Sequence, residues 1–161
     1  MPLRPARDAT PRQVQDALDW NTGGWPWDPY APAIMAAVHQ GVPVLGANLP
    51  RAAIRQAMTD PGLDNHLAGT ALAGQNEAIR LGHCNLLPAD RLQPMLRVQL
   101  ARDASMANAI VDAQVPGKTV VLIAGGGHVL RDRGVPTYLP ATLRVRTVLA
   151  IAGMPSAGDA L

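Results

Sequence analysis

The sequence predicts an α/β fold, in which helices flank a layered and mainly parallel β-sheet. Apolar runs with the length of buried strands occur at 43–48, 118–125 and 142–152. Stretches with helix-start and helix-stop residues lie between these runs, and such alternation is typical of parallel sheets. The clearest strand is 118–125, where β-branched residues and leucine follow a turn. Arginines at alternate positions of 142–152 predict one wetter face for that strand.

The first helix is predicted to begin at Thr10, because a threonine followed by a proline is a favourable helix start. It should run to about Trp20. The loop that follows, 21–30, is rich in glycine and proline, and together with Trp20 it holds every tryptophan of the chain. A second helix is expected from Pro32 to Gln40.

Two more helices are predicted in the middle of the chain, and between them lies one stretch with a weak pattern. Pro50 is expected to open a helix over 51–58. Residues 60–75 carry no clear periodicity, which indicates a loop with a helical turn or two. Asp90 is a suitable N-cap for the longest predicted helix, which spans 91–114.

The composition is that of one globular domain. Of 161 residues, 48% are hydrophobic and 16% are charged, which is enough apolar material for a real core and excludes a disordered chain. We expect a single domain over 1–161, with disordered tails at 1–9 and 154–161. The net charge is +2 and the basic residues are scattered, so nucleic-acid binding is not indicated.

The sequence shows no signal peptide and no membrane-spanning stretch that would indicate a compartment. Cys84 is the only cysteine, so no internal disulfide forms and the redox compartment is left open. No stretch reaches the roughly 18–20 apolar residues of a membrane span. The polar start MPLRPARDAT lacks the apolar centre of a signal peptide. As it stands, the sequence predicts a cytoplasmic chain.

One face of the longest predicted helix carries polar residues inside an apolar stripe. On a helical wheel, Gln99 and Asp103 fall in line with apolar residues such as Met106, and Arg102 flanks them. Burying an amide and a carboxylate costs free energy unless both are hydrogen-bonded. These residues therefore form either a structural network or the lining of a polar cavity at the ends of the strands.

The stretch VLIAGGGHVL ends a predicted strand with three glycines and His128. It lacks the lysine of a phosphate loop and the glycine spacing of a dinucleotide fingerprint. Three glycines allow unusual backbone angles and close approach. We expect a strand-end loop that places His128 at the mouth of a pocket, with a packed histidine as the alternative.

Other histidines are weaker candidates. His83 and Cys84 are adjacent, and because neighbouring side chains of an extended segment point in opposite directions, they would not easily chelate one ion. A catalytic cysteine–histidine pair and a structural loop are both compatible with the sequence. His39 and His66 are expected on the surface.

Tyr30 and Tyr138 are the only tyrosines. A tyrosine phenolate can ligate ferric haem iron, although tyrosines more often pack half-buried.

Five motifs in order identify a resemblance. They are W-N-x-G-G-W-P-W-D-x-Y, P-V-L-G-A-N-L-P-R, G-H-C-N-x-L-P, Q-L-A-R-D-x-S-M-A and A-G-G-G-H-V-x-R-D-R-G-V-P. From about Trp20 to Ala152, the chain resembles the ChaN-like haem-binding (haem uptake) family of the Tiki/TraB-type superfamily. The resemblance implies an α/β domain, often carried by bacterial iron-regulated lipoproteins. It also implies that haem is bound through a tyrosine, in a pocket completed by a homodimer.

The resemblance implies a set of haem-site residues. Tyr138 is the first choice for the ligand of the haem iron, and Tyr30 is the second. Arg133 stands where family members can carry a tyrosine before G-V-P, and with Arg131 it would face the propionates. The full set of expected haem-binding residues is Tyr138, Tyr30, His128, His83, Gln99, Asp103, Met106 and Arg133.

The start of the chain departs from the family pattern. Such proteins begin with a lipoprotein signal and a G-E-x-H strand-loop segment, and neither is present. We therefore expect the C-terminal part of such a domain, which lacks its N-terminal strands and leaves a sheet edge exposed. The family location is the cell envelope, with membrane association through an N-terminal lipid anchor.

The function that the resemblance implies is non-enzymatic haem binding in bacterial iron acquisition. A metal-dependent hydrolase is the alternative, in which His128, His83 and Asp103 hold a metal or act as a general base. A fragment that is inactive alone is the third reading.

Overall fold

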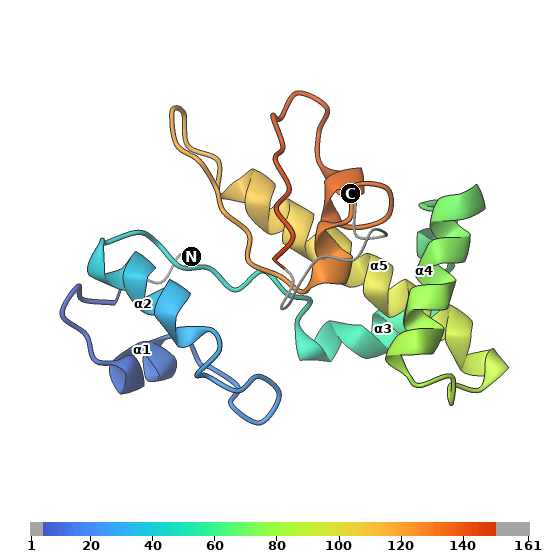
Figure 1. The fold of residues 1–161 in the computed structure, drawn as a ribbon, viewed down its shortest axis with the longest axis horizontal. Helices are drawn as coiled ribbons and strands as arrows, with labels where there is room; N and C mark the ends of the chain where they lie inside the picture. The colour runs from blue at the N-terminus through green and yellow to red at the C-terminus, as the bar shows by residue number, and fades with distance from the viewer. Residues whose placement is uncertain (1–4, 151–161) are drawn as a thin grey trace. The chain divides into compact units, whose positions relative to one another are not determined.

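The structure is a computed structural model that describes residues 5–150. The chain divides into two compact units, an N-terminal unit that ends at Gly46 and a C-terminal unit that begins at Ala47 (Figure 1). Each unit is described separately. The prediction of a single domain over 1–161 stays a prediction. Of the tails predicted to be disordered, 1–4 and 154–161 lie outside the described residues.

The N-terminal unit holds two helices, α1 (Pro11–Ala17) and α2 (Ala31–His39). Both were expected from their start signals. Thr10 caps α1 through a reciprocal capping box with Gln13, which satisfies two of the free N–H groups at the helix start. Helix α1 ends before the predicted Trp20, because Asp19 adopts a left-handed backbone with φ of 48°.

The C-terminal unit is organised around one long helix, α5 (Ala89–Asp112), against which α3, α4, η2 and η4 pack (Figure 1). The long helix was predicted, but its N-cap position is Pro88 and not Asp90. The elements around it are η1 (Arg51–Ala53), α3 (Ile54–Thr59), η2 (Pro61–Asn65), α4 (Gly69–Gly82), η3 (Gly126–Val129) and η4 (Val135–Tyr138).

Helix α4 corrects the prediction of a loop over 60–75. Its small residues conceal the helical pattern in the sequence, but Ile79 is buried and Leu72 packs beside it. These side chains meet Leu96 and Leu100 of α5, which are each 1% exposed. The helix is therefore held by packing against α5 more than by local helix signals.

A second cluster lies further along α5. Met106 and Ala107 are buried there together with Val135 of η4, and Tyr138 packs against the cluster. Leu122 from the segment before the glycines also packs on it. This cluster is the apolar floor on which the 122–139 region rests.

The predicted mainly parallel sheet is wrong. Residues 5–150 form no β-strand: 118–125 and the described part of 142–152 carry no strand assignment, and 43–48 has only an isolated β-bridge at Val44. The side chains of 118–125 still alternate, since Leu122 packs inward while Val121 is 76% exposed. Apolar alternation indicates an extended backbone, but a sheet also needs a neighbouring chain to bond the backbone N–H and C=O groups.

One ion pair ties three elements of the C-terminal unit together. Arg97 of α5 binds the Asp64 carboxylate with two nitrogens, Nη2 to Oδ2 at 2.6 Å and Nε to Oδ1 at 2.7 Å. Its Nη1 donates to the Met58 carbonyl at 3.2 Å, at the end of α3. The Arg97 hydrogen bond lowers the pKa of Asp64 to about 2. The pair clamps α3 and η2 to α5.

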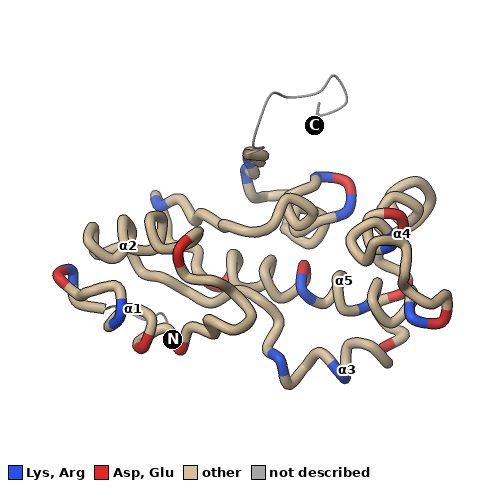
Figure 2. The backbone as a smooth tube through the Cα atoms, turned by 60° about the horizontal axis from the view of Figure 1, so that its bottom comes forward, with Lys and Arg blue, Asp and Glu red and all other residues tan. Residues whose placement is uncertain are grey.

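Charged residues are otherwise dispersed. Lys and Arg alternate with Asp and Glu along the backbone without gathering into one run (Figure 2). The described helices include none with the length and apolar character needed to span a bilayer.

Candidate functional site

The candidate site is built on a hydrogen bond between α5 and the glycine loop. Nδ1 of His128 lies 2.6 Å from Oδ1 of Asp103, and the Asp103 side chain is fully buried. Gln99 stands one turn earlier on α5, with Nε2 3.0 Å from the same ring nitrogen. Two residues predicted from the helical stripe and one from the glycine loop therefore meet in space.

The hydrogen bond fixes the form of the His128 ring. An ionised carboxylate only accepts hydrogen bonds, so Nδ1 carries the proton and donates it to Asp103. Because this Nδ1–H donates to Asp103, it cannot also accept from the Gln99 amide, and the 3.0 Å approach of the Gln99 Nε2 is a contact between two donors and not a second hydrogen bond. The neutral ring then has its lone pair on Nε2, which has no hydrogen-bond partner among residues 5–150.

A glycine outside the triplet makes this placement possible. Gly125, Gly126 and Gly127 do not use the left-handed backbone that three glycines permit. The restrictive position is Gly134, where an added Cβ would strike the carbonyl oxygen of His128 and lie 2.7 Å from its carbonyl carbon. The chain folds back against η3 only because residue 134 has no side chain.

Next to this pair, His66 and Tyr138 form a stack. Their ring centroids are 3.6 Å apart and the planes are 9° from parallel. Nε2 of His66 lies 2.8 Å from Oγ1 of Thr137, and that hydroxyl donates to the Gly134 carbonyl. The hydroxyl must therefore accept from His66, so Nε2 of this ring carries a proton.

Two buried oxygens in this region have no hydrogen-bond partner within residues 5–150, Oδ2 of Asp103 and Oη of Tyr138. Burial raises the pKa of the Tyr138 phenol well above its ordinary value, and the negative charge of Asp103 adds to the rise. Burial also raises the pKa of the Asp103 carboxyl, against the opposing effect of its hydrogen bond with His128. The region is polar, poorly solvated and incompletely paired.

Other predicted residues lie elsewhere or act differently. His83 is exposed, and its Nδ1 lies 2.8 Å from the Ile79 carbonyl at the end of α4, as in a helix cap. Arg133 packs over Gly74 of α4 and lies 3.6 Å from the Asp132 carboxylate. Met106 is 7% exposed and belongs to the apolar floor beneath Tyr138.

Tyr30 belongs to the N-terminal unit. Its ring packs among tryptophans, 5.6 Å from the centroid of Trp20 and 5.9 Å from that of Trp25. Trp20 also contacts Trp27 edge-on and donates its indole N–H to the Trp25 carbonyl at 2.8 Å. Tyr30 is thus part of an aromatic cluster that holds the 20–30 loop.

The environment of His66 differs from the one that the sequence predicts. It was expected on the surface, yet it is partly buried, and burial lowers its pKa. Its partner Thr137 is 71 residues away along the chain. No local pattern around His66 indicates such a contact.

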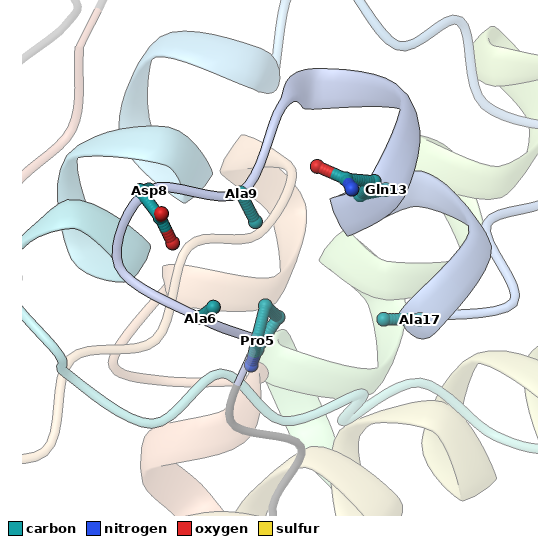
Figure 3. Close-up of a pocket in the computed structure, with 6 residues that line it drawn as sticks. All are labelled: Pro5, Ala6, Asp8, Ala9, Gln13 and Ala17. Carbon is teal, nitrogen blue, oxygen red and sulfur yellow. The ribbon is translucent and has the colours of Figure 1, made fainter.

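Two of the hollows on the described surface are lined without tyrosine, histidine, cysteine or methionine. The larger, about 540 Å³, lies between α3 and α5 and is lined without tyrosine, histidine, cysteine or methionine. The other, about 450 Å³, lies beside α1 (Figure 3). Its lining consists of Pro5, Ala6, Asp8, Ala9, Gln13 and Ala17. The donor atoms suited to iron therefore lie outside both hollows.

The Thr137 hydroxyl and the His66 ring do not form a nucleophile–base pair in this arrangement. The Thr137 hydroxyl is committed as a donor to Gly134, so His66 is not placed to activate it as a nucleophile. Within residues 5–150, no three His, Cys, Asp or Glu side chains gather as ligands for a metal ion. What the site presents is one imidazole that a buried carboxylate orients.

Comparison with known proteins identifies the family. The family model described as haem-binding uptake, Tiki superfamily, ChaN matches residues 5–139. The match covers most of the chain, so the chain belongs to this family, and the resemblance found in the sequence is confirmed.

Among solved structures, the chain is similar to ChaN of Campylobacter jejuni, for which cofacial haem binding is described. The TM-score is 0.65 at 24% sequence identity, over 80% of this chain and 51% of that chain. The likeness shows a shared fold, and this chain spans about half the length of that relative. No curated protein matches the chain.

Proposed function

We propose that this chain binds haem and that its role is non-enzymatic, in bacterial iron acquisition. Membership of a haem-binding uptake family supports the proposal. The observation that carries it is the His128 imidazole, which a buried carboxylate holds through Nδ1 while Nε2 has no hydrogen-bond partner among the described residues. An imidazole oriented by a carboxylate is a common arrangement for a metal-binding histidine.

The residues around His128 fit the needs of haem. Haem requires an axial donor, an apolar surface and cations for its two propionates. Donors are present in the His128 imidazole and in the Tyr138 phenol, whose oxygen is buried and has no hydrogen-bond partner in the described part of the chain. The apolar floor around Met106 lies beneath them. Arg131 is exposed three residues after His128 and supplies a cation.

Bound haem would supply the iron centre, and the chain's own residues would hold it. Tyr138 stays the tyrosine ligand that we predict from the family resemblance, with Tyr30 second. In this structure the Tyr138 phenol is covered by His66, and burial raises its pKa. Ligation by a phenolate would therefore require Tyr138 to lose its proton and the stack to open.

Hemin titration tests the function directly. Purified wild-type chain should shift the Soret band of hemin with saturation at one haem per site. The double variant Tyr138→Phe/His128→Ala should weaken binding by at least about tenfold, because both donors are gone. His39→Ala is the matched control, since His39 is exposed in the N-terminal unit. Wild-type chain that leaves the hemin spectrum unchanged would contradict the proposal.

The proposal also covers assembly and location. The family resemblance supports a homodimer that completes the haem pocket, in the cell envelope, with attachment to the membrane through a lipid anchor. Light scattering after gel filtration should show a mass near twice that of the 16.9 kDa chain when hemin is added. A mass that stays monomeric at saturating hemin would rule out the dimeric form.

A further inference from the structure

We infer that the hollow between α3 and α5 is a docking groove for a basic helix of a partner protein. The hollow has a volume of about 540 Å³, and every residue of its lining belongs to the C-terminal unit. It lies apart from His128 and Tyr138, neither of which lines it. The inference is therefore independent of the proposed haem-binding function.

Two contacts fix the direction of the groove. Oγ of Ser105 donates to the Ala47 carbonyl at 3.1 Å, and Nη1 of Arg97 donates to the Met58 carbonyl at 3.2 Å. The chain from 47 to 58 therefore runs antiparallel to α5. Because α3 has six residues and α5 has 24, the α3 wall is much shorter than the α5 floor. The groove thus follows the last turns of α5, which end at Asp112.

The lining of the groove is low enough for a helix to lie close to α5. Five alanines line it, two from the α3 side and three from α5, namely Ala53, Ala57, Ala101, Ala104 and Ala109. The distance between packed helix axes depends on the side chains at the contact, so alanines allow a close approach. Leu49 and Leu63 add apolar surface on the α3 side. This shape suits the apolar face of a helix, as in other helix-in-groove complexes.

The charges of the groove select a cationic occupant. Asp60 and Asp112 are the charged residues of its lining, and both are exposed. Neither carboxylate forms an ion pair within residues 5–150. Arg97 lies within the field of Asp60, but its guanidinium is committed to Asp64 and to the Met58 carbonyl. The carbonyl end of the α5 dipole adds negative charge beside Asp112.

The positions of the two carboxylates set the spacing of the cations on the partner. Asp60 follows α3 at the Arg97 end of the groove, and Asp112 is the last residue of α5. From Ala101, the first residue of α5 in the lining, the helix rises about 16 Å to Asp112. About eleven residues of a partner helix span that rise in roughly three turns, so both ends lie on one face. We expect lysine or arginine at positions i and i+11, with alanine or leucine between them on that face.

Fluorescence anisotropy with a labelled synthetic helix tests the groove. The probe is a peptide of about 18 residues with two lysines at the i, i+11 spacing, alanine and leucine on the face between them and glutamine elsewhere. The control peptide has the same composition, with both lysines moved to the opposite face. The wild-type chain should bind the probe about three- to tenfold more tightly than the control, because two exposed ion pairs are gained. Added salt should reduce this difference by screening the charges.

Variants of the chain test the lining. Asp60→Asn/Asp112→Asn should weaken probe binding about three- to tenfold, and asparagine keeps the side-chain oxygen that accepts from the Gly62 N–H. Asp8→Asn/Asp28→Asn is the matched control, since it removes the same charge from two exposed carboxylates of the N-terminal unit and should bind like wild type. Ala104→Gln narrows the groove and should also weaken binding. Circular dichroism and urea midpoints check that each variant is folded.

Three results would overturn the inference. The first is equal binding of the probe and the control peptide by the wild-type chain. The second is a folded Asp60→Asn/Asp112→Asn variant that keeps the affinity of wild type. The third is a chain that is dimeric in gel filtration without any ligand and becomes monomeric in Ala104→Gln, because the groove then holds a second copy. No hemin enters these measurements, so their outcome does not depend on the hemin titration.

Discussion

The rings of His66 and Tyr138 are stacked face to face, with their centroids 3.6 Å apart. His66 also bonds to Thr137, the residue before Tyr138, which lies 71 residues further along the chain. This contact joins the segment between η2 and α4 to η4. It also buries the tyrosine oxygen without giving it a hydrogen-bond partner among the described residues.

Tyr138→Phe should stabilise the chain by about 1 kcal/mol. The substitution keeps the stacked ring and removes a buried hydroxyl that bonds to none of the residues 5–150, so the desolvation cost of that hydroxyl disappears. Urea unfolding followed by circular dichroism measures the change. A variant that unfolds at lower urea than wild type would show that the hydroxyl makes a stabilising contact.

His66→Ala should cost about 1–2 kcal/mol at pH 7.5, through loss of the ring stack and the hydrogen bond to Thr137. Burial lowers the pKa of His66 below its ordinary value of 6.5. Below pH 6.5 the unfolded chain therefore takes up a proton that the folded chain resists, and stability falls. The difference between wild type and variant should shrink from pH 7.5 to pH 5, as measured by urea midpoints.

The Asp64–Arg97 pair should make the chain less stable as the pH falls below about 4. The pKa of Asp64 is lowered from 3.8 to about 2, so the ionised carboxylate favours the folded state above pH 4. This contribution is lost as the pH falls through 2. Asp64→Asn should lower the thermal midpoint at pH 6, and the gap to wild type should close between pH 4 and pH 2. A gap that is constant with pH would contradict the ion-pair account.

Gly134→Ala should destabilise the chain by about 2–3 kcal/mol, because the added methyl would strike the backbone of His128. Gly127→Ala is the matched control, since its Cβ would enter open space. It should change stability by less than about 0.5 kcal/mol. Thermal unfolding of both variants gives the comparison, and equal effects at the two positions would count against the close contact.

Leu100→Ala should cost about 2–5 kcal/mol, the range for emptying a buried leucine site. Leu100 is 1% exposed and lies where α4 meets α5. Leu86→Ala is a control with the same chemistry at a side chain that is 82% exposed. Urea midpoints should separate the two variants clearly.

The sequence predicts those helices whose signals are local. Thr10 with its proline marks α1, and the apolar periodicity marks α5. Helix α4 is missed because small residues give a weak pattern and its support comes from leucines of α5. The sheet is predicted wrongly because alternation along 118–125 reports the shape of one segment, whereas pairing depends on a second segment that no local signal specifies.

The residues of the candidate site also fall into those that the sequence predicts and those that it does not. Gln99 and Asp103 are one helical turn apart, so their shared face follows from the sequence. The glycine loop allows His128 to reach these two residues, but nothing in the sequence specifies that it does, because 25 residues separate Asp103 from His128. His66 escapes prediction since its contacts are with a distant turn that a glycine, Gly134, allows to fold back.

The extended segments 118–125 and 142–150 affect the solubility of the protein at high concentration. Val121, Ile123 and Val148 are 76%, 65% and 77% exposed, so three branched apolar side chains face water from segments that form no strand within residues 5–150. Such edges attract one another and lower solubility. Threonine at these three positions would keep the branched shape while adding a hydroxyl, and the purified chain should then stay in solution at concentrations where the wild type precipitates.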